Sequence, residues 1–283
     1  MSYENPPLPQ DVNVSRDHPV GEFLRLAAGL ALLVTAASVA LYFGAGALAR
    51  LLPLETERSM VGDRVLGIEL PEAGKAGRPV VTYLQELTER LAGQMDMPEG
   101  SSLRVHYIET KVPNAFAALG GHIAVTRGLY ESMPSENALA LVLAHEIAHV
   151  RARDPIAGLA GSATMLLAIA LVSGDAANLS SAFATVVQRG YSRRAEAEAD
   201  EAAIAAVKRL YGHAGGGSDV FEVLARHRDS LGGEAPALLS THPLDEDRIA
   251  RMKAAADGWD AEQQPLRPLA VAPAKAVADD PHS

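Results

Sequence analysis

The residues most able to do chemistry in this sequence are the pentapeptide His-Glu-Ile-Ala-His at positions 145–149. Residues four apart on a helix share one face, so His145 and His149 can direct ring nitrogens at a single zinc ion. Glu146 would stand beside a water on that ion and could take its proton, which is the arrangement of a hydrolase. The alternative is a pair of hydrogen-bonded core histidines beside a solvated glutamate, because the surrounding residues are apolar.

A catalytic zinc ion needs a third protein ligand, and in this chain a histidine or a carboxylate must supply it. The acidic segment at 193–200 offers Glu196, Glu198 and Asp200 on a predicted helix. Glu196 and Asp200 share a face, so Asp200 could accept the spare N–H of a ligand histidine while Glu196 binds the ion. Glu198 lies on nearly the opposite side. Taken alone, the segment also fits an ordinary solvated helix face.

The elements that must position these residues are mainly helical. Helical spacing or capping signals predict helices at 79–93, from Ser135 through 150, at 191–210, at 219–231 and at 243–256. A strand is predicted at 103–108, and residues 112–126 read as a β-hairpin around Gly120 and Gly121. The expected fold is therefore an α+β, mainly helical domain with a small sheet.

Two long apolar segments raise the question of a membrane. The run from Leu26 to Ala49 has no charged residue and would form a helix about 36 Å long, more than the roughly 30 Å hydrocarbon core. It is too long for a cleaved signal peptide, so we expect an uncleaved anchor. Pro155–Gly174 is long enough to span, but its glycines, serine and threonine favour a helix buried in the protein or lying against the membrane beside the active site.

These patterns divide the chain into a flexible N-terminal tail at 1–20, a transmembrane anchor at 21–54, a metallopeptidase domain at 55–256 and a disordered tail at 257–283. Arginines flank both ends of the anchor, so the positive-inside rule does not fix its orientation.

Composition excludes several classes of protein. The 283 residues carry a formal net charge of −10 and include no dense basic tract, which argues against nucleic-acid binding. The chain has no cysteine, so disulfides, thiolate zinc sites and cysteine nucleophiles are excluded.

Four separated motifs together resemble a known family. HEIAH at 145–149, YSRRAEAEAD at 191–200, NAFAALGGHIAVTRGLY at 114–130 and STHPLDEDRI at 240–249 are similar to the membrane-associated zinc metallopeptidases that include HtpX-like bacterial proteases and CAAX prenyl proteases. The resemblance covers roughly residues 55–256.

The resemblance implies a gluzincin fold with one zinc ion per chain, Glu196 as third ligand and Asp200 behind a ligand histidine. It implies that His242 acts near the metal, stabilising the oxyanion or restraining the zinc in a resting state. It also implies that residues 114–126 form the edge of the cleft. An unpaired strand there could bind substrate by strand addition, and the alternative is a hairpin with a purely structural role. The expected substrate-binding residues are Asn114, Ala115, Phe116, Gly121, His122, Ile123 and Ala124.

We therefore expect a membrane-anchored zinc endopeptidase that acts on proteins or peptides in quality control. By resemblance it would be a single-pass protein of the bacterial inner membrane. The side of its catalytic domain is left open, with the periplasmic side as one option. The alternative is a membrane-tethered chaperone-like or peptide-binding module that uses the same cleft with little turnover. Processing of prenylated C termini would need a multi-helix membrane chamber that these hydrophobic segments cannot build.

Overall fold

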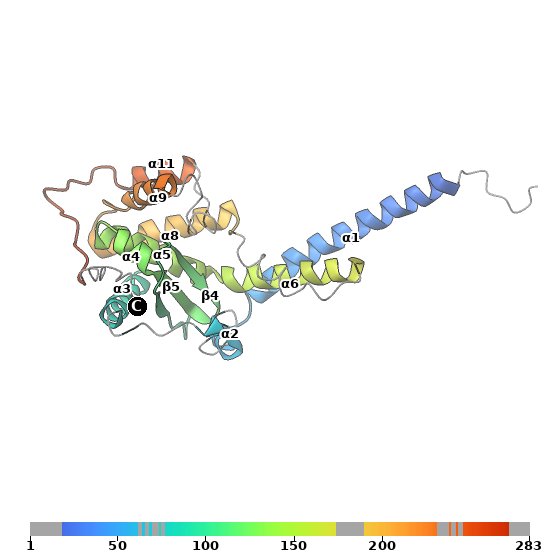
Figure 1. Cartoon of the computed structure of the whole chain (residues 1–283), viewed down its shortest axis with the longest axis horizontal. Coiled ribbons are helices and arrows are strands. Elements are labelled where there is room, and N and C mark those ends of the chain that lie inside the picture. Colours follow the sequence, from blue (N-terminus) through green and yellow to red (C-terminus); the bar gives the residue numbers. More distant parts are fainter. Residues whose placement is uncertain are drawn as a thin grey trace, which may run out of the picture.

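A long N-terminal helix projects from a mainly helical body that contains a small sheet (Figure 1). The computed structural model describes residues 19–61, 64–65, 68–69, 74, 77–173, 190–230, 238, 242 and 246–271. The predicted fold class is confirmed. Most of the expected flexible tail at 1–20 lies outside the described residues.

The helices include all the predicted ones, most of them with ends within a few residues of the prediction, and two short ones, at 54–61 and 127–132, that the sequence did not predict. They are α1 (Pro19–Ala49), α2 (Leu54–Val61), α3 (Arg78–Ala92), α4 (Arg127–Ser132), α5 (Glu136–Ala152), α6 (Asp154–Ser173), α8 (Arg193–Tyr211), α9 (Asp219–Ser230) and α11 (Glu246–Ala255). The strands are β1 (Arg64–Val65), β2 (Ile68–Glu69), β3 (Arg104–Ile108), β4 (Ala115–Ala118) and β5 (His122–Thr126), and a 3-10 turn, η1, spans Leu119–Gly121.

The main sheet has three strands in the order β3-β5-β4, so β5 is central and β4 lies at one edge. β4 and β5 pair antiparallel, as the hairpin prediction requires, and β3 pairs parallel with β5. Gly120 and Gly121 form the turn with φ of 75° and 81°, a left-handed region that glycine adopts without strain. A Cβ on Gly121 would lie 2.5 Å from the carbonyl oxygen of Ser102, so the turn also needs the missing side chain.

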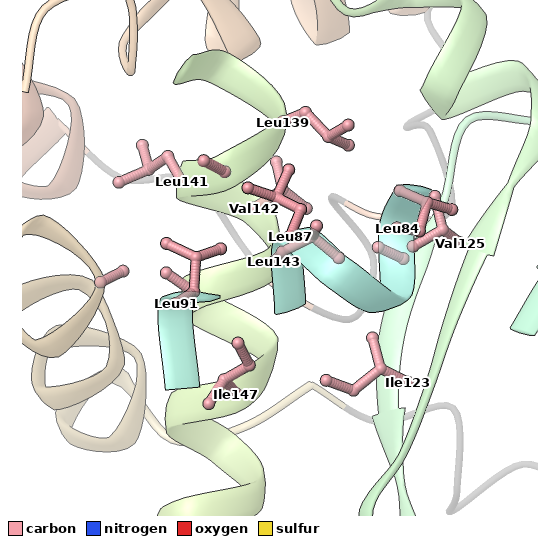
Figure 2. Packing of buried hydrophobic residues seen from close by; sticks show 14 of the residues in the cluster. Leu84, Leu87, Leu91, Ile123, Val125, Leu139, Leu141, Val142, Leu143 and Ile147 are labelled. Atoms are coloured by element: carbon pink, nitrogen blue, oxygen red, sulfur yellow. The ribbon is translucent and has the colours of Figure 1, made fainter. Parts of the chain in front are cut away.

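The hydrophobic core joins three elements around α5 (Figure 2). Leu84, Leu87 and Leu91 repeat at helical spacing on α3 and are fully buried against α5. Ile123 and Val125 of β5 complete this contact from the sheet side. Since α5 also packs on α8, the helix that carries the HEIAH motif is held on several sides.

α1 is long and apolar enough to cross a bilayer, with a mean hydropathy of 2.1 in its most apolar stretch. Its large apolar side chains, such as Phe23, Leu32 and Phe43, are exposed. α6 runs back along its C-terminal half (Figure 1).

Two glycines bring α1 and α6 together. A Cβ on Gly46 would lie 3.1 Å from the Ala157 carbonyl oxygen, and one on Gly161 would lie 3.0 Å from the Tyr42 ring. The pairs 46–157 and 42–161 show that the helices are antiparallel. The segment from Pro155 is thus helical, as expected, but it packs on α1; Gly174 lies outside the described residues.

The expectation of a disordered tail at 257–283 is wrong for residues 257–271. Trp259 stacks on His213 with ring centroids 5.6 Å apart, and the Arg267 backbone N–H donates to Asn137 Oδ1 over 2.8 Å. The Arg267 carbonyl oxygen accepts the Glu136 backbone N–H, an otherwise unpaired donor at the start of α5. Proline and alanine content indicated disorder, but these long-range contacts order residues 257–271; residues 272–283 lie outside the described part.

Candidate metal centre

Helix α5 positions the HEIAH motif. It begins at Ser135, whose hydroxyl accepts the Ala138 backbone N–H, and ends at Arg153, which takes a left-handed conformation with φ of 62°. His145, Glu146 and His149 lie in its last turns and are all buried. The helix therefore ends just after the second histidine, and α6 starts immediately afterwards.

Two further side chains reach this pair of histidines. Glu196 comes from the first turn of α8, and His242 from between α9 and α11. His145 Nε2 lies 3.1 Å from His149 Nε2 and 3.1 Å from His242 Nδ1, and His242 Nδ1 lies 3.0 Å from Glu196 Oε1. One ligand-type atom from each of the four residues lies within 4.8 Å of the others.

These distances fit a metal ion. Ligands about 2.0–2.1 Å from a tetrahedral zinc are about 3.3 Å apart, close to the 3.1–3.5 Å between the two Nε2 atoms and Glu196. The opposite ring nitrogens face carboxylates, so the natural place for each ring proton is Nδ1. Two Nε2 lone pairs then point at each other in a buried space, an arrangement that a cation stabilises.

Each histidine has its own carboxylate behind it. Asp200 Oδ1 lies 3.0 Å from His145 Nδ1, and Asp154 Oδ2 lies 2.9 Å from His149 Nδ1. Asp200 is held in turn by Arg248, whose Nε and Nη2 each donate over 2.7 Å. Carboxylates in this position fix the ring orientation and the tautomer of a metal-binding histidine.

Glu146 faces the same space from the side of the sheet. Its Oε2 accepts the Ala117 backbone N–H of β4 over 2.7 Å. Its Oε1 accepts no hydrogen bond from the described residues, with His242 Nε2 3.5 Å away. A buried carboxylate oxygen of this kind is available to a water or a substrate proton.

Burial and charge act against each other on the titratable groups. Burial would raise the pKa of Glu196, but hydrogen bonds from His145, His149 and His242 outweigh it and lower that pKa. Burial likewise would lower the pKa of His145, yet Asp200 and Glu196 raise it to about 9 in the absence of an ion. The carboxylates around the two histidines therefore favour positive charge between them, which Arg248, 2.7 Å from Glu196 Oε2, supplies in part and a divalent cation could complete.

Tyr191 closes one side of the cluster. Its ring stacks on His149 with centroids 4.1 Å apart. Burial, then the charges of Glu146, Asp154 and Glu196, raise the pKa of its hydroxyl well above the usual value. The hydroxyl therefore keeps its proton beside these carboxylates.

The peptidase family M48 model matches residues 80–256, which include the whole metal centre. The chain belongs to peptidase family M48. A "Protease HtpX homolog" of Salinibacter ruber is 30% identical over 217 residues, covering 64% of this chain and 77% of that protein. The "Mitochondrial metalloendopeptidase OMA1" of Schizosaccharomyces pombe is 27% identical, over 69% of this chain and 56% of its own.

A third relative is the "Putative beta-barrel assembly-enhancing protease" of Vibrio cholerae, which is 38% identical over 152 residues. This match covers 48% of the chain and 31% of the Vibrio protein. The match thus spans less than a third of that relative's length.

In this M48 peptidase the sequence-based residues do not all lie where expected. The structure brings His145, Glu146, His149, Glu196, Asp200 and His242 together. The expected substrate edge is narrower than predicted, because β5 is paired on both sides by β3 and β4. His122, Ile123 and Ala124 on β5 therefore have no free backbone edge, and Gly121 belongs to the turn. Asn114, Ala115 and Phe116, at or just before β4, remain as candidates.

Four residues that surround the metal ligands were not predicted from the sequence. Asp154 follows the second histidine by five residues, a spacing that could have been noticed at the end of the helix. Tyr191 stands in a motif that the resemblance quoted, but nothing local indicates its stacking on a histidine. Arg248 also stands in a quoted motif, at 240–249, but it and Arg50 lie far from HEIAH in sequence and meet it only through the fold.

Proposed function

We propose that this chain is a membrane-anchored zinc endopeptidase. The observation that carries the proposal is the convergence of His145, His149 and Glu196 on one buried point with Glu146 beside it. Two histidines and one glutamate form a ligand set typical of catalytic zinc, and a chain without cysteine has no thiolate to offer.

Each residue has a separate task in peptide hydrolysis. Zinc, when bound, supplies Lewis acidity that polarises a carbonyl and makes water acidic near neutral pH. Glu146 accepts the proton of the attacking water on its free oxygen and then passes it to the leaving amine. Asp200 and Asp154 keep the ligand rings oriented, and Tyr191 excludes water from one side of His149.

His242 is proposed to take the fourth place around the ion in a resting state. Its Nδ1, rather than its outer nitrogen, points at the other ligand atoms. This orientation favours restraint of the metal over stabilisation of an oxyanion, the other role implied by the resemblance. Substrate would then have to displace His242 before cleavage.

Substrate binding is proposed to use the edge of the sheet and an apolar pocket. Because the Ala117 N–H points at Glu146, the odd-numbered residues of β4 direct their backbone away from β5 and toward the site. A pocket beside the metal centre is lined by residues of that centre, Glu146 and His242 among them, and by apolar side chains that include Val142, Val220, Leu224, Leu238 and Met252. An extended peptide with an apolar residue next to the cleaved bond would fit both.

The cellular setting is proposed from α1 and from the relatives. α1 would anchor the protein in a bilayer of the bacterial inner-membrane type, which would keep the protease close to unfolded or membrane-associated proteins. A quality-control role follows the resemblance to HtpX-like proteases. The competing function, a chaperone-like module with little turnover, would use the same cleft without needing Glu146.

Comparing the wild-type chain with Glu146→Gln tests this proposal. Both proteins should bind about one zinc per chain, while the variant should cleave an unfolded casein-type substrate at least about 100-fold more slowly. Glu198→Gln, an exposed carboxylate on α8, is the matched control and should cleave normally. Equal cleavage by Glu146→Gln would contradict the mechanism, and equal peptide binding with negligible wild-type cleavage would favour the binding module.

A further inference from the structure

The end of the apolar helix α1 lies against the metal centre. Arg50 follows the last residue of α1, and its Nη2 lies 2.6 Å from Asp154 Oδ1. The other oxygen of that carboxylate, Oδ2, lies 2.9 Å from His149 Nδ1. One carboxylate therefore joins the end of the proposed membrane anchor to a proposed zinc ligand.

We propose that Asp154 is a positioning residue for His149 and that Arg50 sets the orientation of Asp154, so that α1 is part of the support of the metal centre. This inference rests on the proposed function and names a dependence of the same site. It goes beyond anchoring, because a simple tether would leave the ion unaffected by the residue at its end.

The exposure of Arg50 and of Asp154 indicates that their contact orients the carboxylate rather than stabilises the fold by charge pairing. The Asp154 side chain is 5% exposed, whereas that of Arg50 is 49% exposed. A half-exposed ion pair contributes little to the stability of a fold. A buried carboxylate with two possible acceptor oxygens, however, needs a fixed rotamer to hold a ring N–H in one direction. Arg50 takes one oxygen and leaves the other to His149.

His145 has a similar arrangement, although its arginine, Arg248, also lies 2.7 Å from Glu196 Oε2. Asp200 accepts from His145 and is held by Arg248 of α11. Each ring is thus supported by a carboxylate that an arginine from another element orients. The difference is that one arginine belongs to the catalytic body and the other follows the apolar helix.

The segment after Arg50 is also seated on the catalytic body. Arg153, the residue that ends α5, donates from Nη2 to the Leu52 carbonyl oxygen and pairs with Glu57 Oε2, each over 2.7 Å. Glu57 Oε1 accepts the Gly120 backbone N–H in the turn next to β4. These buried contacts fix residues 50–57 relative to α5, so Arg50 meets Asp154 in a defined place.

The test measures zinc affinity by chelator competition on the full chain in detergent, together with kcat, KM and the melting temperature of the zinc-free protein. Asp154→Asn should lower zinc affinity about 10- to 100-fold, and Arg50→Gln should lower it by a smaller factor, about three- to tenfold. Arg50→Lys should restore most of the loss. In the Asp154→Asn background, Arg50→Gln should change nothing further, because the two act through one contact.

Arg194→Gln is the matched control, since Arg194 forms an exposed ion pair of 2.8 Å with Glu198 on α8. It should leave zinc affinity and kcat unchanged. Wild-type affinity in Asp154→Asn overturns the whole inference, and wild-type affinity in Arg50→Gln alone overturns the link to α1. A lower melting temperature of zinc-free Arg50→Gln with additive losses in the double variant would show general destabilisation and also overturn it.

Failure of the proposed function would look different. In that case the wild-type chain would bind no zinc, or Glu146→Gln would cleave as fast as wild type. A chain that binds zinc with an affinity insensitive to residues 50 and 154 would contradict this inference alone.

Discussion

At the scale of single residues, the sequence distinguishes most clearly between Glu196 and Glu198 as the third metal ligand. The structure buries Glu196 to 2% exposure beside the histidines, whereas Glu198 is exposed and pairs with Arg194. Glu196 and Glu198 thus lie on the two sides of α8 that four-residue spacing predicts, because this spacing is a local property of the helix. The role of Glu196 as a metal ligand stays a prediction.

Zinc content should depend on Glu196 and not on its neighbour. Glu196→Ala should lose the ion on dialysis, as should His145→Ala and His149→Ala, because each variant removes one of the three proposed catalytic ligands and leaves an incomplete set. Metal analysis after dialysis provides the measurement, with Glu198→Ala as the control on the same helix. Zinc loss in Glu198→Ala with full retention in Glu196→Ala would mean that the other carboxylate binds the ion.

Replacing His242 should raise activity, unlike replacing the other residues of the centre. If its Nδ1 occupies the fourth place around the ion at rest, His242→Ala should open that place and raise cleavage of an unfolded substrate several-fold while zinc content stays near one. Initial rates at saturating substrate measure this. A fall of kcat with unchanged zinc content would instead assign His242 to the oxyanion.

At the scale of elements, local patterns predicted far more than long-range ones. The Ser135 cap, the leucine spacing of α3 and the two glycines of the hairpin each encode their element within a few residues. The central place of β5 and the pairing of Arg50 with Asp154 depend on segments far apart in the chain. A single sequence has no signal for such pairings, so the substrate edge was predicted too wide.

The edge position of β4 predicts that the backbone N–H groups of alternate substrate residues contribute to binding. In a model peptide, N-methylation should raise KM at alternate residues, because only every second backbone N–H would face β4. Methylation of the residues between should have little effect on KM. Kinetics on a series of singly methylated peptides of identical side-chain sequence measures this, and a flat KM profile would count against strand addition.

At the scale of the whole molecule, two sequence-based expectations conflict. Leu26–Ala49 was expected to cross the bilayer and Pro155–Gly174 to stay out of it. Yet α6 begins beside Arg50 and runs antiparallel along α1, with Ala157 against Gly46. If the hydrocarbon core covers α1 from Leu26 to Ala49, it covers the start of α6 as well.

Deleting residues 1–50 should therefore not release the protein from the membrane. The face of α6 that contacts α1 would lose its partner and remain apolar. We expect the truncated chain to stay in the membrane pellet after alkaline carbonate extraction, with the full chain as reference. Its appearance in the supernatant would show that α1 alone holds the protein in the membrane.

The contacts of residues 257–271 also change what should be regarded as one cooperative unit. The family match ends at residue 256, but the chain continues across the start of α5, where Arg267 caps the helix and Tyr130 donates to the Val271 carbonyl oxygen. The region that matches the family model is therefore shorter than the region whose contacts we expect to unfold together. Drawing the boundary at residue 256 would remove the hydrogen bonds from Arg267 to the start of α5, the helix that carries the HEIAH motif.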